Sequence, residues 1–321
     1  MNRILTNNPT LCQCRFTEGD LAGSKGIHFP VPLVILMLCL TQHIAIAQQP
    51  QIANSMGGAT TDAGVPLPTG WTLQQSDMFG TDGNVTNYTQ LHAKYCEGQF
   101  YNVDSSGCLV QLPNVVINDE QETYEHFETS IVFFTNHLTI QGRGQPNGVI
   151  QSAEMVAKYT PRNFCIEARY QIPATPGSWP AFWFGSSTSQ NSASEIDVEQ
   201  PVFLNGDEGV YDVGLANHPT PGTLAIANRN FDPQWMVYHS DIDFSAAPHY
   251  YTTCYNNRRG VIKRWIDGGL IYTATNWKWV GSNPAAIINL AVGGVPGNLA
   301  DPSAYVGNLD IYSIEYYAPS R

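Results

Sequence analysis

The sequence predicts an all-β fold in which antiparallel sheets pack face to face as a sandwich or jelly roll. The chain is rich in turn-forming and strand-forming residues, with 28 glycines, 21 prolines and 16 tyrosines. Short apolar segments recur with turn signals between them. No amphipathic helix of about 12 or more residues stands out by apolar spacing. The 321 residues are 43% hydrophobic, which indicates one large core.

Glycine and proline mark the ends of most candidate strands. Gly142-x-Gly144 ends one segment, Pro173–Gly177 separates two others, and Gly268-Gly269 marks a tight turn. The candidate strands are, in chain order, Thr129–Phe134, His137–Gln141, Asn163–Ile172, Ala181–Gly185, Glu195–Glu199, Val261–Ile266, Ala286–Val292 and Leu309–Tyr317.

The charge of the chain narrows the classes of partner. It has 27 acidic and 15 basic residues, a formal net charge of −12 and a pI of about 4.9. Nucleic-acid binding requires a basic surface that neutralises phosphates, so we expect no nucleic-acid partner. The same negative field disfavours a sulfated polysaccharide, although a local cationic patch could still bind one. A neutral ligand fits the composition better.

The N-terminal residues predict an export signal. Val31–Leu40 is an apolar run of about half the roughly 20 residues that a membrane-spanning helix needs. Ala45-x-Ala47 follows it and has the small residues of a cleavage site. We therefore expect residues 1–47 to be a signal peptide, and the mature chain to be extracellular or periplasmic with no membrane segment.

The rest of the chain predicts a short leader and one domain. Residues 48–68 are small, polar and proline-containing, which is typical of a flexible leader. Residues 69–319 show no break in composition and no internal repeat. This length is within the range of one all-β domain, which we expect to be a monomer.

Four cysteines remain after the predicted cleavage: Cys96, Cys108, Cys165 and Cys254. In an exported chain they allow three disulfide pairings. The local pair Cys96–Cys108 is favoured, and Cys165–Cys254 would then follow. None of the four has a Cys-x-x-Cys or Cys/His spacing, so no zinc site is expected.

The sharpest chemical feature is the strand Glu195-Ile196-Asp197-Val198-Glu199. Side chains alternate on a strand, so the three acids are expected on one face and the two apolar residues on the other. Crowded carboxylates repel one another, which separates their pKa values. One ionised and one protonated carboxyl group are what acid–base chemistry on a glycosidic bond requires.

An aromatic segment, Trp179–Gly185, precedes the acidic strand. Its two tryptophans, Trp179 and Trp183, are the residue type that stacks on the apolar face of a sugar ring. They could equally be core residues. Their position beside three acids favours a carbohydrate-binding cleft.

Several short motifs follow one another along most of the domain: Gly70-Trp71-x-Leu73, Ser76-Asp77-x-Phe79, Asn118-Asp119-Glu120-Gln121, Asn136–Ile140, Phe164–Arg169, Trp179-Pro180-Ala181-x-Trp183, Asn217-His218, His249-x-Tyr251, Trp265–Gly268, Asn289–Gly294 and Leu309–Tyr312. In this order they resemble glycoside hydrolase family 16, the laminarinase and lichenase-like enzymes. The resemblance implies a concanavalin-A-like β-jelly-roll of two curved antiparallel sheets that cleaves internal β-linkages of polysaccharides with retention.

Carried over by position, the resemblance assigns a role to each acid. Glu195 is expected to be the nucleophile, Glu199 the general acid/base, and Asp197 the residue that tunes them. Along a straight strand the Cα atoms of Glu195 and Glu199 lie roughly 13 Å apart. A retaining pair needs carboxyl groups about 5–5.5 Å apart, so we expect a bent strand.

The resemblance also suggests further site residues. His218 is expected to hydrogen-bond the sugar or a catalytic carboxylate, and Asn289 to point into the groove. No cofactor and no catalytic metal are expected. Some family members carry a structural calcium ion, for which Asp310 is the one candidate, without any calcium-loop spacing around it.

The sequence also departs from the family's usual motifs. Its acidic motif has the short Glu-x-Asp-x-Glu form of lichenase-like and transglycosylase members, whereas the Trp-Pro-Ala-x-Trp segment is similar to laminarinases. Cys254 stands where a tryptophan commonly follows His-x-Tyr. The leading hypothesis is a secreted endo-acting hydrolase of a neutral β-1,3- or β-1,3-1,4-glucan. An agar-type galactan hydrolase, a glucan transglycosylase and a non-catalytic glycan-binding jelly roll remain alternatives.

Overall fold

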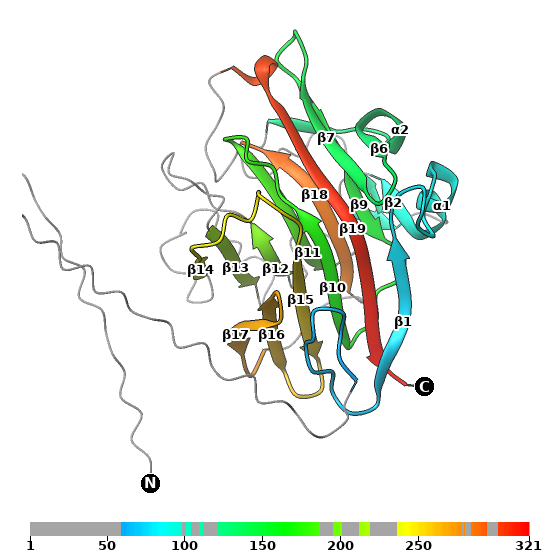
Figure 1. Ribbon diagram of the computed structural model, residues 1–321, viewed down its shortest axis with the longest axis vertical. Helices are drawn as coiled ribbons and strands as arrows, with labels where there is room; N and C mark the ends of the chain where they lie inside the picture. Colours follow the sequence, from blue (N-terminus) through cyan, green and yellow to red (C-terminus); the bar gives the residue numbers. More distant parts are fainter. Residues whose placement is uncertain are drawn as a thin grey trace, which may run out of the picture. The chain divides into compact units, whose positions relative to one another are not determined.

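Strands dominate the part of the chain that the structure, a computed structural model, describes (Figure 1). The described residues are 59–97, 101–103, 109–111, 121–186, 195–200, 212–218, 236–277, 279, 284–293 and 301–320. Among them the helical elements are short: α1 (Tyr88–Lys94), α2 (Phe127–Ser130) and the 3-10 helix η3 (Pro302–Ala304). None of the helices in this set has the length and hydrophobicity needed to cross a membrane.

The larger of the two main sheets contains ten described strands, and neighbouring strands are antiparallel except for one parallel pair, β5 with β8. The long strand β19 (red in Figure 1) lies inside this sheet and pairs with β10, β7 and β1. The strands are, in sheet order, β17 (Gly269–Ala274), β16 (Val261–Ile266), β15 (His249–Asn256), β10 (Phe164–Gln171), β19 (Val306–Pro319), β7 (Leu138–Gly144), β8 (Ile150–Ser152) and β5 (Glu122–Tyr124), with β1 (Trp71–Met78) beside β19 and β6 (Ile131–Phe133) beside β7.

The second sheet carries the acidic strand. It has seven described strands, all in antiparallel pairs. Two further strands, β3 (Tyr101–Val103) and β4 (Leu109–Gln111), pair with each other. The seven are, in sheet order, β14 (Met236–His239), β13 (Asp212–His218), β12 (Glu195–Gln200), β11 (Ser178–Ser186), β18 (Pro284–Val292), β9 (Glu154–Ala157) and β2 (Tyr95–Glu97).

The core lies between these two sheets. Phe164 on β10 stacks on Phe184 of β11, with ring centroids 4.4 Å apart, and Tyr170 meets Phe182 edge-on at 6.4 Å. All four side chains are buried. These aromatic contacts join the sheets and confirm the predicted all-β sandwich.

Residues 59–68 were expected to belong to a flexible leader, and this prediction is wrong for them. Thr60 and Pro66 form a β-bridge, and Val65 is fully buried beside the outer face of the larger sheet. The Thr61 hydroxyl and the Ala63 backbone N–H both donate to the Glu167 carboxylate of β10. The composition of the segment gave no hint of its hydrogen bonds to Glu167, because their partners are 104 and 106 residues apart in sequence.

Most predicted strands are present with ends shifted by a few residues. The exception is Thr129–Phe134, where the chain forms the helical turn α2 before β6. The first N–H of that turn, from Phe127, donates to the Glu97 carboxylate at 2.8 Å. The Tyr88 hydroxyl donates to the Ile131 carbonyl at 2.7 Å, where the strand begins. Tertiary hydrogen bonds therefore override the strand preference of this segment.

The structure confirms the expected disulfide Cys165–Cys254. The two residues lie directly opposite each other on β10 and β15. Cys96 is also disulfide-bonded, and its expected partner Cys108 lies outside the described residues. Cys254 thus serves a covalent cross-link at the position where the resemblance would place a tryptophan.

Candidate active site

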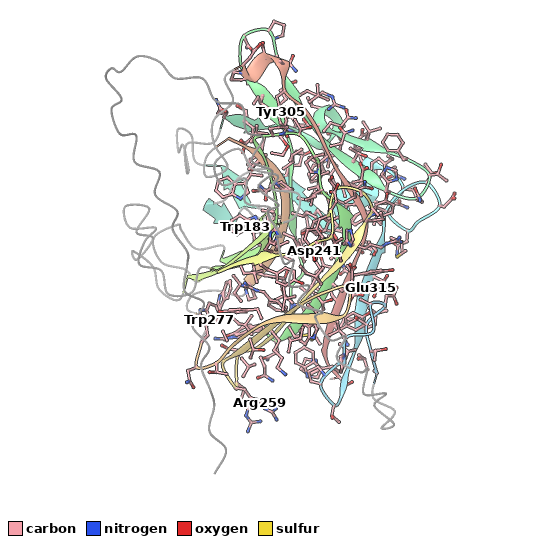
Figure 2. The ribbon with its side chains drawn as sticks, turned by 60° about the vertical axis from the view of Figure 1, so that its left-hand side comes forward. Trp183, Asp241, Arg259, Trp277, Tyr305 and Glu315 are labelled. Atoms are coloured by element: carbon pink, nitrogen blue, oxygen red, sulfur yellow. A yellow bond between two sulfur atoms is a disulfide. The ribbon has the colours of Figure 1, made fainter. Side chains whose placement is uncertain are left out.

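The candidate site lies on the face of the seven-stranded sheet that points away from the core. On β11, Phe182 and Phe184 are core residues, so the alternating position Trp183 points to the other face. Ile196 of β12 is likewise buried in the core. Figure 2 shows Trp183 on this layer and Glu315 on β19 of the other layer.

The backbone register brings the predicted site residues together. Asp197 of β12 lies opposite Trp183 of β11. On the other side of β12, Glu195 lies opposite His218 of β13. Because Ile196 faces the core, strand alternation places positions 195 and 197 on the same face as Trp183. The side chains of Glu195, Asp197, Glu199 and His218 lie outside the described part of the structure.

The pairing of β12 with β13 is interrupted at Glu199. Val198 pairs with Leu215 and Gln200 with Gly214, so Glu199 is the extra residue of a β-bulge. A bulge bends its strand and redirects the bulged residue. Strand alternation was expected to place all three acids on one face. It continues from Glu195 through Val198, and the bulge interrupts it at Glu199. A bend at this point is what two carboxylates four residues apart need in order to approach each other.

Trp183 is held by a hydrogen-bonded pair of side chains. Its indole Nε1 donates to Asn289 Oδ1 on β18 at 2.9 Å. Asn289 Nδ2 in turn donates to the Tyr124 hydroxyl of β5 at 2.6 Å. Asn289 is only 5% exposed, whereas Trp183 is partly exposed. The amide of Asn289 thus fixes the indole at the surface of the sheet.

Trp179 is the other predicted platform. It lies four residues before Trp183 along β11, so strand alternation places both positions on the same face. Trp179 lies opposite Ala291 of β18 and is 6% exposed. Little of its ring is therefore open to a ligand in this structure. Trp183 is the better candidate for a stacking platform.

A buried carboxyl group that belongs to none of the sequence motifs lies beside Asn289. Glu154 of β9 is the register partner of Asn289. Its neighbours Ala153 and Met155 are core residues, so Glu154 points to the face of the site. Burial, and secondarily the charge of Glu122, raise the pKa of Glu154 well above its ordinary value of 4.5. The alternation of polar and apolar residues from Ser152 to Met155 could have revealed it.

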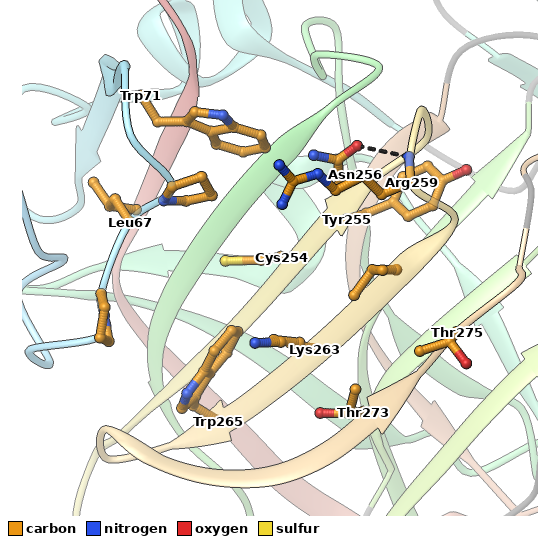
Figure 3. Close-up of a pocket in the computed structure, with 13 residues that line it drawn as sticks. Leu67, Trp71, Cys254, Tyr255, Asn256, Arg259, Lys263, Trp265, Thr273 and Thr275 are labelled. Carbon is orange, nitrogen blue, oxygen red and sulfur yellow. Dashed lines mark hydrogen bonds between the residues drawn. The ribbon is translucent and has the colours of Figure 1, made fainter.

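A separate cavity of about 490 Å³ lies on the outer face of the larger sheet (Figure 3). Residues 66–68 form one wall, and Trp71 and Trp265 stand on either side of Cys254. The strands beneath it, β15, β16 and β17, belong to the other sheet from β11 and β12. This cavity is therefore separate from the candidate active site.

The predicted calcium ligand Asp310 also lies on the larger sheet. Its Oδ1 accepts a hydrogen bond from the Thr139 hydroxyl at 2.6 Å and lies 3.9 Å from His137 Nε2. Calcium takes about six to eight oxygen ligands. A hydroxyl and an imidazole do not supply such a set, so the side chains around Asp310 do not by themselves form a calcium site.

The described strands give the chain the β-jelly-roll fold of laminarinases and related β-glucanases. It is similar to the laminarinase catalytic domain of Thermotoga maritima, with 21% identity over 78% of this chain and 99% of that one and a TM-score of 0.57. It is also similar to an endo-1,3-β-glucanase of Streptomyces sioyaensis, with 17% identity over 79% of this chain and 99% of that one and a TM-score of 0.60. A Bacillus licheniformis β-glucanase is similar with 13% identity over 77% of this chain and 98% of that one and a TM-score of 0.56.

A non-specific endo-β-1,3(4)-glucanase from family GH16 is similar at 17% identity, over 80% of this chain and 94% of that one, with a TM-score of 0.60. The expected resemblance to glycoside hydrolase family 16 is thus confirmed for the fold. Neither a protein-family model nor a curated protein sequence matches the chain.

Proposed function

We propose that the protein is an endo-acting, retaining glycoside hydrolase of a neutral β-glucan with β-1,3 or mixed β-1,3-1,4 linkages. The observation that carries the proposal is the register of β12 against β11, which sets the acidic strand beside Trp183 on the face of the sheet that points away from the core. The laminarinase-like fold supports the same assignment.

The chemistry follows from the residue types. Ionised Glu195 attacks the anomeric carbon and forms a glycosyl–enzyme intermediate, while Glu199 donates a proton to the departing sugar oxygen. Glu199 then removes a proton from water, which hydrolyses the intermediate. Asp197 stands between them in sequence, and its charge favours the protonated form of a neighbouring carboxyl group.

The binding residues divide into two roles. The partly exposed indole of Trp183 is the platform for a sugar ring, and Trp179 and His218 are the next candidates for sugar contacts. Asn289 was expected to contact the sugar. Because its amide binds Trp183 on one side and Tyr124 on the other, we assign it as a positioning residue for the indole.

Disulfide bonding supports the proposed secretion. Cys165 is bonded to Cys254, and Cys96 is also disulfide-bonded. Structural disulfides persist in oxidising compartments and are rare in the cytosol of most organisms. We therefore propose an extracellular or periplasmic monomer whose signal peptide, residues 1–47, is removed.

The test compares the purified protein on laminarin, lichenan, agarose and carrageenan, with products identified by size and linkage. We expect internal cleavage of laminarin or lichenan, and a first-formed product with the β configuration at its new reducing end. Glu195→Gln should abolish release of reducing ends while polysaccharide binding is kept. Asp82→Asn, the same carboxyl-to-amide change at an exposed residue after β1 of the other sheet, should leave the activity unchanged.

Each remaining alternative has its own outcome in this experiment. Cleavage of agarose alone would identify a galactan hydrolase. Products longer than the substrate would identify a transglycosylase. Binding to β-glucan without any new reducing ends would identify a non-catalytic module, and hydrolysis that survives Glu195→Gln would overturn the assignment of the nucleophile.

A further inference from the structure

A second group of chemically active side chains lies at the far edge of the seven-stranded sheet. His92 of α1, Glu97 of β2 and Glu128 of α2 each offer one ligand atom, and these atoms all lie within 4.8 Å of one another. His92 Nε2 is 3.1 Å from Glu128 Oε1 and 3.5 Å from Glu97 Oε1. In the sheet order, β18 and β9 separate β2, which carries Glu97, from β11, so the cluster is distinct from the candidate active site.

The two distances from His92 Nε2 are close to the edges of a tetrahedral metal site. Zinc binds imidazole nitrogen at about 2.0–2.1 Å and carboxylate oxygen at about 2.0–2.2 Å. In a tetrahedron with such bonds the ligand atoms are about 3.3–3.5 Å apart. An ion between His92, Glu97 and Glu128 therefore needs only small side-chain movements. The fourth position would be left to water.

The proposed ligands are already held in place by the protein. The Phe127 backbone N–H donates to Glu97 Oε1 at 2.8 Å, and His126 Nδ1 is 2.8 Å from Glu97 Oε2. The His92 ring lies against the ring of buried Phe127, with centroids 5.0 Å apart and planes inclined by 30°. A hydrogen-bonded outer partner of this kind orients a metal-binding carboxylate and raises the affinity.

The cluster is also open and negatively charged. The side chains of His92, Glu97 and Glu128 are 41%, 21% and 52% exposed, so an ion can enter directly from solvent. Two carboxylates face one imidazole nitrogen, a combination of nitrogen and oxygen donors that suits first-row divalent transition metals.

We propose that His92, Glu97 and Glu128 bind one divalent transition-metal ion of the zinc type, with His126 as the outer partner of Glu97. The ion cross-links α1, β2 and α2, and its role is structural. These residues show no metal-binding spacing in the sequence because they come from three elements that only the fold brings together.

The experiment titrates Zn²⁺ into the untagged protein by calorimetry and follows the thermal unfolding midpoint in parallel. We expect one saturable site per chain and a midpoint that rises with zinc, because an ion that binds only the folded state stabilises it. Cobalt in place of zinc should give the intense visible absorption of a tetrahedral site. Hydrolytic activity is not part of the readout, so failure here is distinguishable from failure of the proposed function.

Variants locate the site. His92→Gln and Glu128→Gln should each weaken zinc binding by about 100-fold, and His126→Gln by about tenfold, the range found for outer partners. His239→Gln, at an exposed histidine of β14, should bind zinc like the wild type. Glu128 is exposed and its glutamine variant keeps the size of the side chain, so its folding is not at risk. The proposal is overturned if the wild type shows no saturable site, or if the folded Glu128→Gln or His92→Gln protein keeps wild-type affinity.

Discussion

Trp183 and Asn289 are joined across the β11–β18 pair by a hydrogen bond of 2.9 Å from the indole Nε1 to the amide Oδ1. The same amide donates to the Tyr124 hydroxyl. A stacking platform contributes to binding only when its ring is held at the right angle, and this chain of side chains restrains the indole. The orientation of the proposed sugar platform is therefore set by a residue beside it.

Replacing Asn289 should disturb substrate binding more than turnover. Asn289→Leu removes the acceptor of Trp183 Nε1 and the donor to Tyr124 at nearly constant volume. We expect KM for the β-glucan to rise about tenfold, a smaller change in kcat, and a loss of about 1–3 kcal/mol in the free energy of unfolding. Steady-state kinetics and urea unfolding measure both. Tyr124→Phe, which leaves the bond to Trp183 intact, is the control, and an unchanged KM in Asn289→Leu would contradict the positioning role.

The buried Glu154 predicts how stability depends on pH. Its folded pKa lies above the ordinary value of 4.5, chiefly because burial disfavours the charged form. The folded state therefore binds the proton more tightly, and this contribution to stability is complete below pH 4.5 and is lost as the pH rises toward the folded pKa. Glu154→Gln is always neutral. We expect its unfolding free energy, relative to wild type, to increase between about pH 4.5 and pH 8 in urea titrations.

The control for this prediction is Glu128→Gln. The pKa of Glu128 is lowered, first by the hydrogen bond from its own backbone and then by His92. Its contribution to stability is present above the unfolded pKa and is lost as the pH falls, which is the opposite sign. A Glu154→Gln difference that does not change with pH would show that the carboxyl group is not selectively protonated in the folded state.

The disulfide Cys165–Cys254 closes a long loop, since its ends are 89 residues apart in sequence. A cross-link of this kind restricts the unfolded chain and typically stabilises by about 2–4 kcal/mol. The double variant Cys165→Ala, Cys254→Ala should lose that amount in guanidinium unfolding under non-reducing conditions. The result that contradicts the prediction is a double variant with the wild-type unfolding midpoint.

The packing of residues 59–68 can be tested at Val65, which is fully buried. Val65→Ala should lower the free energy of unfolding by about 1–3 kcal/mol, because it removes buried methyl groups and leaves a cavity. Leu73→Ala is the matched control at a side chain that is 48% exposed, and it should change the stability by less than about 0.5 kcal/mol. Equal, small effects in both variants would contradict the packing of residues 59–68 and support the original prediction of a flexible leader.

The sequence predicted those features that depend on local pattern. Val261–Ile266 has the bounds of β16 as expected, because glycine turns flank it, with Gly260 before the strand and Gly268-Gly269 after it. The position of Asp197 beside Trp183 followed from two neighbouring strands joined in one sheet. The Cys165–Cys254 bond followed from preferring the local pair among four cysteines.

Features that depend on distant contacts were not predictable in this way. The helical turn at Phe127 forms because a carboxylate thirty residues earlier in the chain, Glu97, binds its first N–H. The bulged segment Val198-Glu199-Gln200 contains no glycine or proline, so the sequence does not indicate a β-bulge there. Glu154 became a site candidate only when the fold paired its strand with that of Asn289.

The place of β19 in the larger sheet sets an order on biosynthesis. This strand pairs with β10, β7 and β1, and each of them precedes it in the chain. Trp71 of β1 and its partner Pro319 are separated by nearly all of the described domain. Partners so distant in sequence favour slow folding. During synthesis β1, β7 and β10 are therefore made before β19, the strand with which all three pair. The larger sheet can be completed only after β19 has been made.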